Sequence, residues 1–369
     1  RFDRSIPVPG ARVKLRSIKA KTLIKAALFI LLLAQPITSS VNADELAERD
    51  AIDSTVRELI AKQDFAELEK IATSFLNGRA RTSSGLWKIG LYDDAIADVF
   101  RCKCSNDEFW IGAEENMKGW IKKYPESINA HLAYAHMLLE KAWSIRGWGY
   151  TDTVAPESWK PFHEQVEKAR AFLKEHEAIG IADPRWNNMI VGIANLQEIS
   201  ETKYEVLANT ALERHPDYYP IYFEVMFHHA PKWGGSAEAI ENFAREAVAR
   251  SRAKEGHGMY ARIYWYAAQS QYGNNLFQFS SVDWPEMKKG IDDVLKAFPD
   301  QWNINNFAKF ACIARDREKT RDLLDQMSGN PIPSAWGDDT TLEYCKAWAL
   351  GEQVEPEIDP SRQIVAPPP

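Results

Sequence analysis

Three segments of the chain begin alike, and they constrain its fold more than any other feature. Each opens with an aromatic ring, a proline and an acidic residue, and continues into a stretch rich in alanine and aromatic residues. They are YPESINAHLAYAHMLL (124–139), HPDYYPIYFEVMFHH (215–229) and FPDQWNINNFAKFACIA (298–314). A proline and an acidic residue suit the first turn of a helix, because the N1 amide needs no partner and the macrodipole favours negative charge there. The recurrence predicts a repeated helical unit.

The segments between these three also have the pattern of helices. In residues 183–199, apolar side chains recur at intervals of three and four, as on one buried helix face: they are Trp186, Met189, Ile190, Ile193 and Leu196. The same spacing in 203–216 gives Tyr204, Leu207, Ala208, Ala211 and Leu212. Residues 317–327 form the second half of another helix pair. No stretch alternates with period two for long enough to predict a sheet.

We therefore predict an all-α fold of stacked antiparallel helix pairs, a tetratricopeptide-like α-solenoid, over residues 124–351. An N-terminal helical segment, 44–123, precedes it. Inserts at 146–160 and 270–285 break the repeat period. Because single pairs cannot bury their apolar faces alone, neighbours stack and leave a concave surface. Residues 352–369 hold five prolines and no periodicity, which predicts a disordered tail.

Residues 1–43 have the pattern of a secretory signal peptide. Basic residues lead into the short apolar run AALFILLLA (26–34), and Val41-Asn42-Ala43 fits the small-x-small pattern of a cleavage site. The apolar run is too short to span a bilayer. We therefore predict cleavage after Ala43, a periplasmic or secreted protein, and no membrane insertion once the signal is removed.

The net charge of the chain without residues 1–43 disfavours two classes of partner. Residues 1–43 hold 8 of the 45 Lys and Arg but only one of the 52 Asp and Glu, which leaves 37 basic and 51 acidic residues and a formal net charge of −14 in 44–369. Such a charge disfavours nucleic acid and anionic membrane surfaces as partners.

Four cysteines, at positions 102, 104, 312 and 345, can oxidise in an exported chain. Cys102 and Cys104 are too close in sequence for an easy bridge. Two thiolates without a second ligand pair nearby also do not make a zinc site. Cys312 and Cys345 lie on two expected helices and form the favoured disulfide.

Several strings resemble the bacterial family known as domain of unknown function 4034. They are SSGLWKIGLYDD, AWSIRGWGY, DPRWNNMI, PDYYPIYFEVMFHHAPKWGGS, GMYARIYW and PDQWNINNFAKFACIARD, between about residue 80 and about residue 340. The resemblance implies an all-α, tetratricopeptide-like fold that often occurs in exported bacterial proteins. The family has no assigned activity, so it supplies no catalytic residue.

The string HHAPKWGGS (228–236) has the composition of a site and the pattern of a turn. Adjacent histidines on a helix point about 100° apart, so we do not expect His228 and His229 to chelate a metal together. Pro231 ends the helix, two glycines turn the chain, and Ser236 can cap the next helix. The alternative is an anion held by the amides of 235–238 beside Lys232.

Arg262 lies in the middle of GMYARIYWYAAQ, a helix that is apolar on nearly every side. A guanidinium there needs a carboxylate or several carbonyls. Glu224 is the candidate partner, and a ligand carboxylate is the alternative. His163 and Glu167 in HEQVE stand at metal-ligand spacing but lie in a charged stretch, which indicates a solvated helix face.

Glycines at 147 and 149 break another helix and place Arg146 and Trp148 in a loop, where binding residues concentrate on rigid scaffolds. We predict a non-catalytic protein that binds a protein or peptide of the cell envelope in its concave face. No cofactor, metal or catalytic residue is predicted. The predicted binding residues are Arg146, Trp148, Tyr218, Tyr219, Trp233, Tyr260 and Arg262.

Two other functions remain open. The 13 Trp and 13 Tyr suit stacking on sugars, which favours a protein that binds or hydrolyses envelope glycan. The acidic surface suits an exported inhibitor or immunity-type protein that blocks a basic target.

Overall fold

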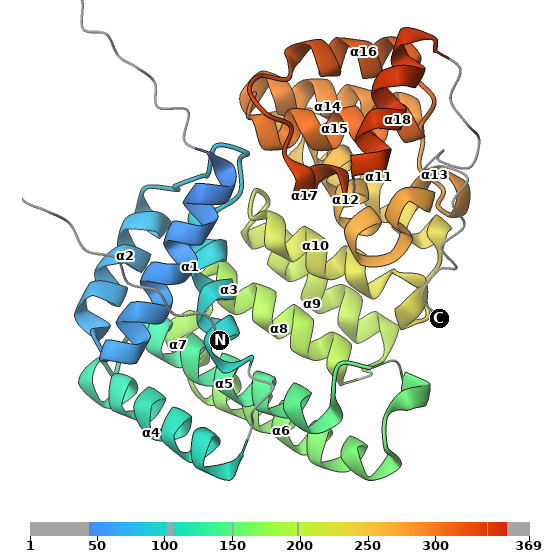
Figure 1. Cartoon of the computed structure of the whole chain (residues 1–369). Coiled ribbons are helices and arrows are strands. Elements are labelled where there is room, and N and C mark those ends of the chain that lie inside the picture. Colours follow the sequence, from blue (N-terminus) through green and yellow to red (C-terminus); the bar gives the residue numbers. More distant parts are fainter. Residues whose placement is uncertain (1–43, 102–105, 150, 198, 338, 353–369) are drawn as a thin grey trace, which may run out of the picture. The chain divides into compact units, whose positions relative to one another are not determined.

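The computed structural model describes residues 44–101, 106–149, 151–197, 199–337 and 339–352 (Figure 1). Within these ranges the chain is all-α, as predicted, and its one β-bridge joins Arg81 to Trp87. None of the described helices is both long and apolar enough to cross a membrane. The predicted signal peptide, the tail from residue 353 onward, Cys102 and Cys104 lie outside the described residues.

The helices follow one another as antiparallel pairs. The first half of the chain contains α1 (Glu45–Lys62), α2 (Phe65–Asn77), α3 (Lys88–Phe100), α4 (Asp107–Lys123), α5 (Ile128–Arg146), α6 (Pro156–Glu175) and the short α7 (Glu177–Gly180). The second half contains α8 (Pro184–Leu196), α9 (Glu201–Arg214), α10 (Tyr219–His228), α11 (Ala237–Glu255), α12 (Gly258–Ala267), α13 (Leu276–Phe279), α14 (Trp284–Ala297), α15 (Gln301–Ile313), α16 (Arg317–Gln326), α17 (Pro333–Trp336) and α18 (Asp339–Leu350). Most of the longer helices pack on a helix next to them or one further along the sequence, as α5 does on α6 and α12 does on α14.

The three similar segments do begin helices, although one turn later than predicted. Their helices α5, α10 and α15 start at residues 128, 219 and 301, so the proline and the acidic residue lie in the turn before each helix. Side chains at the boundary cap two of them: Ser127 accepts from the amide of Ala130, and Asp300 accepts from the amide of Trp302. These caps satisfy amides that have no partner inside the helix.

The segment between α2 and α3 is a structural part of the core. The indole of Trp87 donates to the carbonyl of Asp217 at 2.7 Å, just before α10. The carbonyl of Ser84 accepts from Arg262 on α12 and from Asn303 on α15. Helices from both ends of the chain therefore meet at this segment, and α1 also packs on α15.

The favoured cysteine pair is present as a disulfide. Cys312, at the end of α15, is bonded to Cys345 on α18, and both residues are buried. The bond closes a loop with a sequence separation of 33 and ties the last helix to the core.

Candidate functional site

Four of the seven residues predicted to bind a partner lie in the interior. Tyr218, Tyr219, Tyr260 and Arg262 are each no more than 4% exposed. A partner that approaches the surface cannot touch them, so this part of the prediction is corrected. Their aromatic and aliphatic atoms stabilise the core instead.

The guanidinium of Arg262 also has different partners from the one predicted. Its Nη2 donates to the carbonyl of Ser84 at 3.2 Å. Its guanidinium lies over the rings of Tyr219 and Phe298, 4.7 and 5.6 Å from their centroids. Glu224, the expected partner, is not among these contacts. The reason is that Arg262 faces the segment between α2 and α3, a long-range contact that no sequence periodicity indicates.

The other three predicted residues remain accessible. Trp148 follows α5, is 58% exposed and stacks on Trp143 with ring centroids 5.2 Å apart. The guanidinium of Arg146 lies over Trp143 and Trp159, at 5.2 and 4.8 Å from their centroids. Trp233 is partly buried. Arg146 and Trp148 therefore belong to an aromatic and cationic surface cluster at the end of α5.

The string HHAPKWGGS forms the predicted turn. Pro231–Trp233 is a single 3-10 turn, Gly234 adopts a left-handed conformation with φ 89°, and the hydroxyl of Ser236 accepts from the amide of Ala239 at 3.0 Å. This is the cap predicted for α11. The prediction of a solvated face at HEQVE is confirmed as well, since His163 and Glu167 are both exposed.

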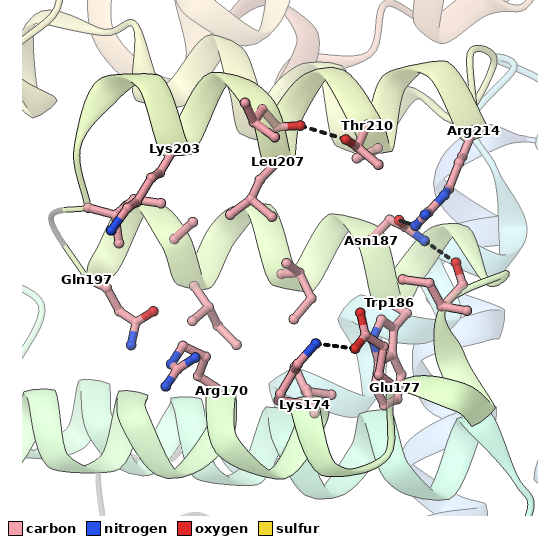
Figure 2. Close-up of a pocket in the computed structure, with 18 of the residues that line it drawn as sticks. Arg170, Lys174, Glu177, Trp186, Asn187, Gln197, Lys203, Leu207, Thr210 and Arg214 are labelled. Carbon is pink, nitrogen blue, oxygen red and sulfur yellow. Dashed lines mark hydrogen bonds and ion pairs between the residues drawn. The ribbon is translucent and has the colours of Figure 1, made fainter.

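A groove of about 850 Å³ runs between α6 and α9, with α8 as its floor (Figure 2). Both walls pack on α8, and the space between them stays open. Apolar side chains from all three helices line it: Leu173 on α6, Trp186, Ile190 and Ile193 on α8, and Val206 and Leu207 on α9.

The wall formed by α9 exposes two apolar side chains. Val206 is 62% exposed and Leu207 is 36% exposed. The three-four spacing predicts that Leu207 is buried, which the structure corrects, whereas Tyr204 and Leu212 of the same pattern are buried. Val206 is the one sequence feature that indicates an exposed apolar surface on α9, because it lies off the three-four spacing of its neighbours. Exposed apolar patches of this kind mark interaction sites.

Basic side chains border the groove. Figure 2 shows them on both walls: Arg170 and Lys174 on α6, and Lys203 and Arg214 on α9. Glu177 is the one acidic residue of the lining, and it pairs with Lys174. Arg170 pairs with Glu167 outside the groove at 2.5 Å, and Arg214 donates to the amide oxygen of Asn187 at 3.3 Å. The lining therefore holds four basic residues and one acidic residue, in a chain whose net charge is −7, and the two basic residues on α9 carry most of the positive charge that is not paired with a carboxylate.

Two acidic side chains elsewhere have strongly raised pKa values. Desolvation, together with the nearby charge of Asp94, raises the pKa of Glu224 on α10 to about 7. Desolvation and the charge of the neighbouring Asp93 also raise the pKa of Asp94 on α3, but this side chain is exposed, so solvent weakens both effects. The two carboxyl groups influence each other, so α3 and α10 place them in one electrostatic environment. No spacing in the sequence indicates this pair, because α3 and α10 are far apart along the chain.

A buried ionic network lies beside them. His136 on α5 is 3.0 Å from the carboxylate of Asp93, and Arg185 on α8 pairs with Asp183 at 2.8 Å. Burial alone would raise the pKa of Asp93, but the charge of His136 and its hydrogen bond outweigh burial and lower it. Burial alone would likewise lower the pKa of His136, but Asp93 raises it. Because Arg185 also lies 3.9 Å from the carboxylate of Asp93, the network joins α3, α5 and α8.

Comparison of the chain with protein-family models, curated proteins and solved structures finds no match. The resemblance to domain of unknown function 4034 gains no support from these comparisons and stays a prediction.

Proposed function

We propose that the protein is a non-catalytic helical-repeat adaptor that binds another protein of the cell envelope through the groove between α6 and α9. The occupant is an amphipathic helix with acidic residues along its polar edge. The exposed apolar wall at Val206 and Leu207 carries this proposal. The disulfide between Cys312 and Cys345 fits an exported protein, since such bonds persist in oxidising compartments.

A helix suits the groove better than an extended peptide. Extended peptides gain much of their affinity by pairing with an exposed strand edge. The walls and floor of the groove are helices whose backbone groups are already paired, and the described residues form no strand. A helix satisfies its own backbone and needs only apolar contact. The α9 wall has 14 residues, or about 20 Å at 1.5 Å per residue, so it matches a helix of about four turns.

The basic residues that border the groove favour a partner with negative charge. Lys203 and Arg214 border the groove on α9, and Arg170 borders it on α6, where Glu167 already neutralises part of its charge. Acidic residues flanking an apolar stripe would meet these cations, whereas basic residues would be repelled. Such pairs at a solvated rim change selectivity and association rate more than affinity.

Fluorescence anisotropy with designed 14-residue helical peptides tests the proposal. The peptides share one apolar face and differ in whether their polar face is acidic or basic. We expect the acidic peptide to bind and Val206→Glu to weaken it at least tenfold. Ile111→Glu is the matched control, because Ile111 is 58% exposed on α4, outside the groove. Equal binding of the basic peptide, or equal effects of the two substitutions, would contradict the proposal.

A glycan hydrolase is the second candidate function, and the raised pKa values favour it. A glycosidase needs one carboxylic acid that stays protonated near neutral pH beside a second carboxyl group. Desolvation and the charge of Asp94 raise the pKa of the partly buried Glu224 to about 7, and Asp94 would be the second carboxyl group. If this function holds, the purified protein releases soluble fragments from envelope glycan and Glu224→Gln abolishes the release. Peptide binding without glycan release excludes this candidate.

A further inference from the structure

His228, the last residue of α10, is held in a fixed orientation. Its ring stacks on Tyr204 with centroids 3.6 Å apart and an interplanar angle of 14°. Its Nδ1 lies 2.8 Å from the side-chain oxygen of Asn195 on α8. An amide oxygen accepts, so Nδ1 carries the proton. In the neutral imidazole this leaves the lone pair on Nε2.

A carboxylate from another helix faces that nitrogen. Glu201 is the first residue of α9, and its two carboxylate oxygens lie 3.1 and 3.3 Å from Nε2 of His228. Within the part of the chain that the structure describes, Glu201 has no lysine or arginine as an ion-pair partner. The side chain of Glu201 is 61% exposed, so solvent reaches its carboxylate.

His229 brings a third donor to the same place. One ring nitrogen of each histidine and one carboxylate oxygen of Glu201 all lie within 4.8 Å of one another. This differs from the expectation that the adjacent histidines diverge. The reason is that His229 is the cap residue at which α10 ends, and α9 delivers Glu201 to both rings.

We propose that Glu201, His228 and His229 form a zinc site. Two imidazoles and one carboxylate are a ligand set that Zn²⁺ prefers, and ligands about 2.0–2.1 Å from a tetrahedral ion lie about 3.3 Å apart. The carboxylate of Glu201 and Nε2 of His228 already have that separation. His229 closes the remaining distance by side-chain rotation. Water or a group from a partner takes the fourth position.

Asn195 is the positioning residue of this site. Metal-bound histidines usually donate their other ring N–H to a second group, which fixes the tautomer and the ring orientation. Asn195 holds His228 in this way and is itself buried. A bound ion would tie the start of α9 to the end of α10, across a sequence separation of 27. Because the unfolded chain lacks that geometry, zinc should stabilise the fold.

Titration of the purified protein, with no histidine tag, tests the site. Isothermal titration calorimetry with Zn²⁺ measures the stoichiometry. Co²⁺ bound in place of Zn²⁺ has visible absorption bands, which report whether nitrogen and oxygen ligands surround the ion tetrahedrally. We expect one ion per chain and a zinc-dependent rise in Tm. Glu201→Gln and His229→Ala should each weaken zinc binding by about tenfold or more, and Asn195→Ala should weaken it to a smaller extent.

A matched control tests whether an ordinary contact between a histidine and a carboxylate also binds zinc. His257 lies 2.9 Å from the carboxylate of Glu286, the same kind of contact without a second histidine. His257→Ala should leave zinc binding unchanged. Glu201→Gln removes an exposed charge and is not expected to impair folding, so it keeps the test valid if a histidine variant unfolds. No zinc binding, or binding that survives both Glu201→Gln and His229→Ala, would overturn the proposal whether or not the groove binds a peptide.

Discussion

Arg262 donates through Nη2 to the main-chain carbonyl of Ser84 at 3.2 Å, across 178 positions of sequence. Asn303 donates to the same carbonyl at 3.1 Å. A buried carbonyl in the segment between α2 and α3 therefore receives one donor from α12 and one from α15. Because the two donors come from separate helix pairs, this carbonyl links three parts of the repeat stack. Loss of either donor should therefore destabilise the whole fold.

The first prediction concerns Arg262 itself. Arg262→Ala should lower the free energy of unfolding by about 2–4 kcal/mol, because it removes a buried hydrogen bond and cation–π contacts with Tyr219 and Phe298. Urea unfolding followed by circular dichroism measures the change. Arg252→Ala is the control, since Arg252 is exposed on α11. If Arg262→Ala left stability intact but reduced binding, a ligand-binding role for this residue would return.

The second prediction uses the glycine that follows Ser84. Gly85 has φ 93°, and a Cβ at this position would lie 2.7 Å from the guanidinium of Arg262. Gly85→Ala should therefore destabilise the protein by about 1–3 kcal/mol. Gly112→Ala, inside α4 with open space around it, should instead stabilise it by about 0.5–1 kcal/mol. Thermal unfolding of the two variants should shift Tm in opposite directions, and a shared direction would contradict the assigned packing.

The third prediction concerns the disulfide. A bond that closes a loop with a sequence separation of 33 should contribute roughly 3–4 kcal/mol to stability through the entropy of the unfolded chain. Unfolding of the Cys312→Ser/Cys345→Ser double variant should start at lower denaturant concentration and detach α18 first. Hydrogen exchange, read peptide by peptide, measures the order. Faster exchange spread evenly over the molecule would argue against a local tether.

Local patterns explain which parts of the fold were predictable. The spacing of Trp186 and Ile193 sufficed for α8, and Pro231 with Ser236 sufficed for the turn before α11, because neighbours in sequence determine these features. The same reasoning fails for Tyr218 and Tyr260. Aromatic residues serve cores and interfaces equally well, and only the packing of distant segments decides between them.

The groove was not predictable for a related reason. Its existence depends on how far α6 stands from α9, and the short α7 and its turn intervene between α6 and α8. No periodicity encodes that separation. The zinc proposal shows the same limit: the angular rule for adjacent helical residues holds inside a helix, but His229 lies where α10 ends, and Glu201 arrives from a different helix.

The last prediction follows from the raised pKa of Glu224. Its folded-state pKa of about 7 lies above the ordinary value of 4.5, so between these values the folded protein binds more protons than the unfolded chain. The contribution of Glu224 to stability is therefore most favourable below about pH 4.5 and is lost as pH rises through about 7. The glutamine side chain in the variant Glu224→Gln cannot ionise. The free energy of unfolding of this variant, relative to wild type, should therefore be about 1–3 kcal/mol higher at about pH 8 than at about pH 5.

Denaturant titrations of wild type and Glu224→Gln at the two pH values measure this difference. Comparing the two proteins cancels the effects of groups that do not interact with Glu224, such as the pair of His136 and Asp93. Glu213→Gln on α9 is the control, because Glu213 is exposed, and its difference from wild type should not change with pH. A pH-independent difference for Glu224→Gln would mean that Glu224 ionises freely. That result would also remove the protonated acid on which the hydrolase candidate depends.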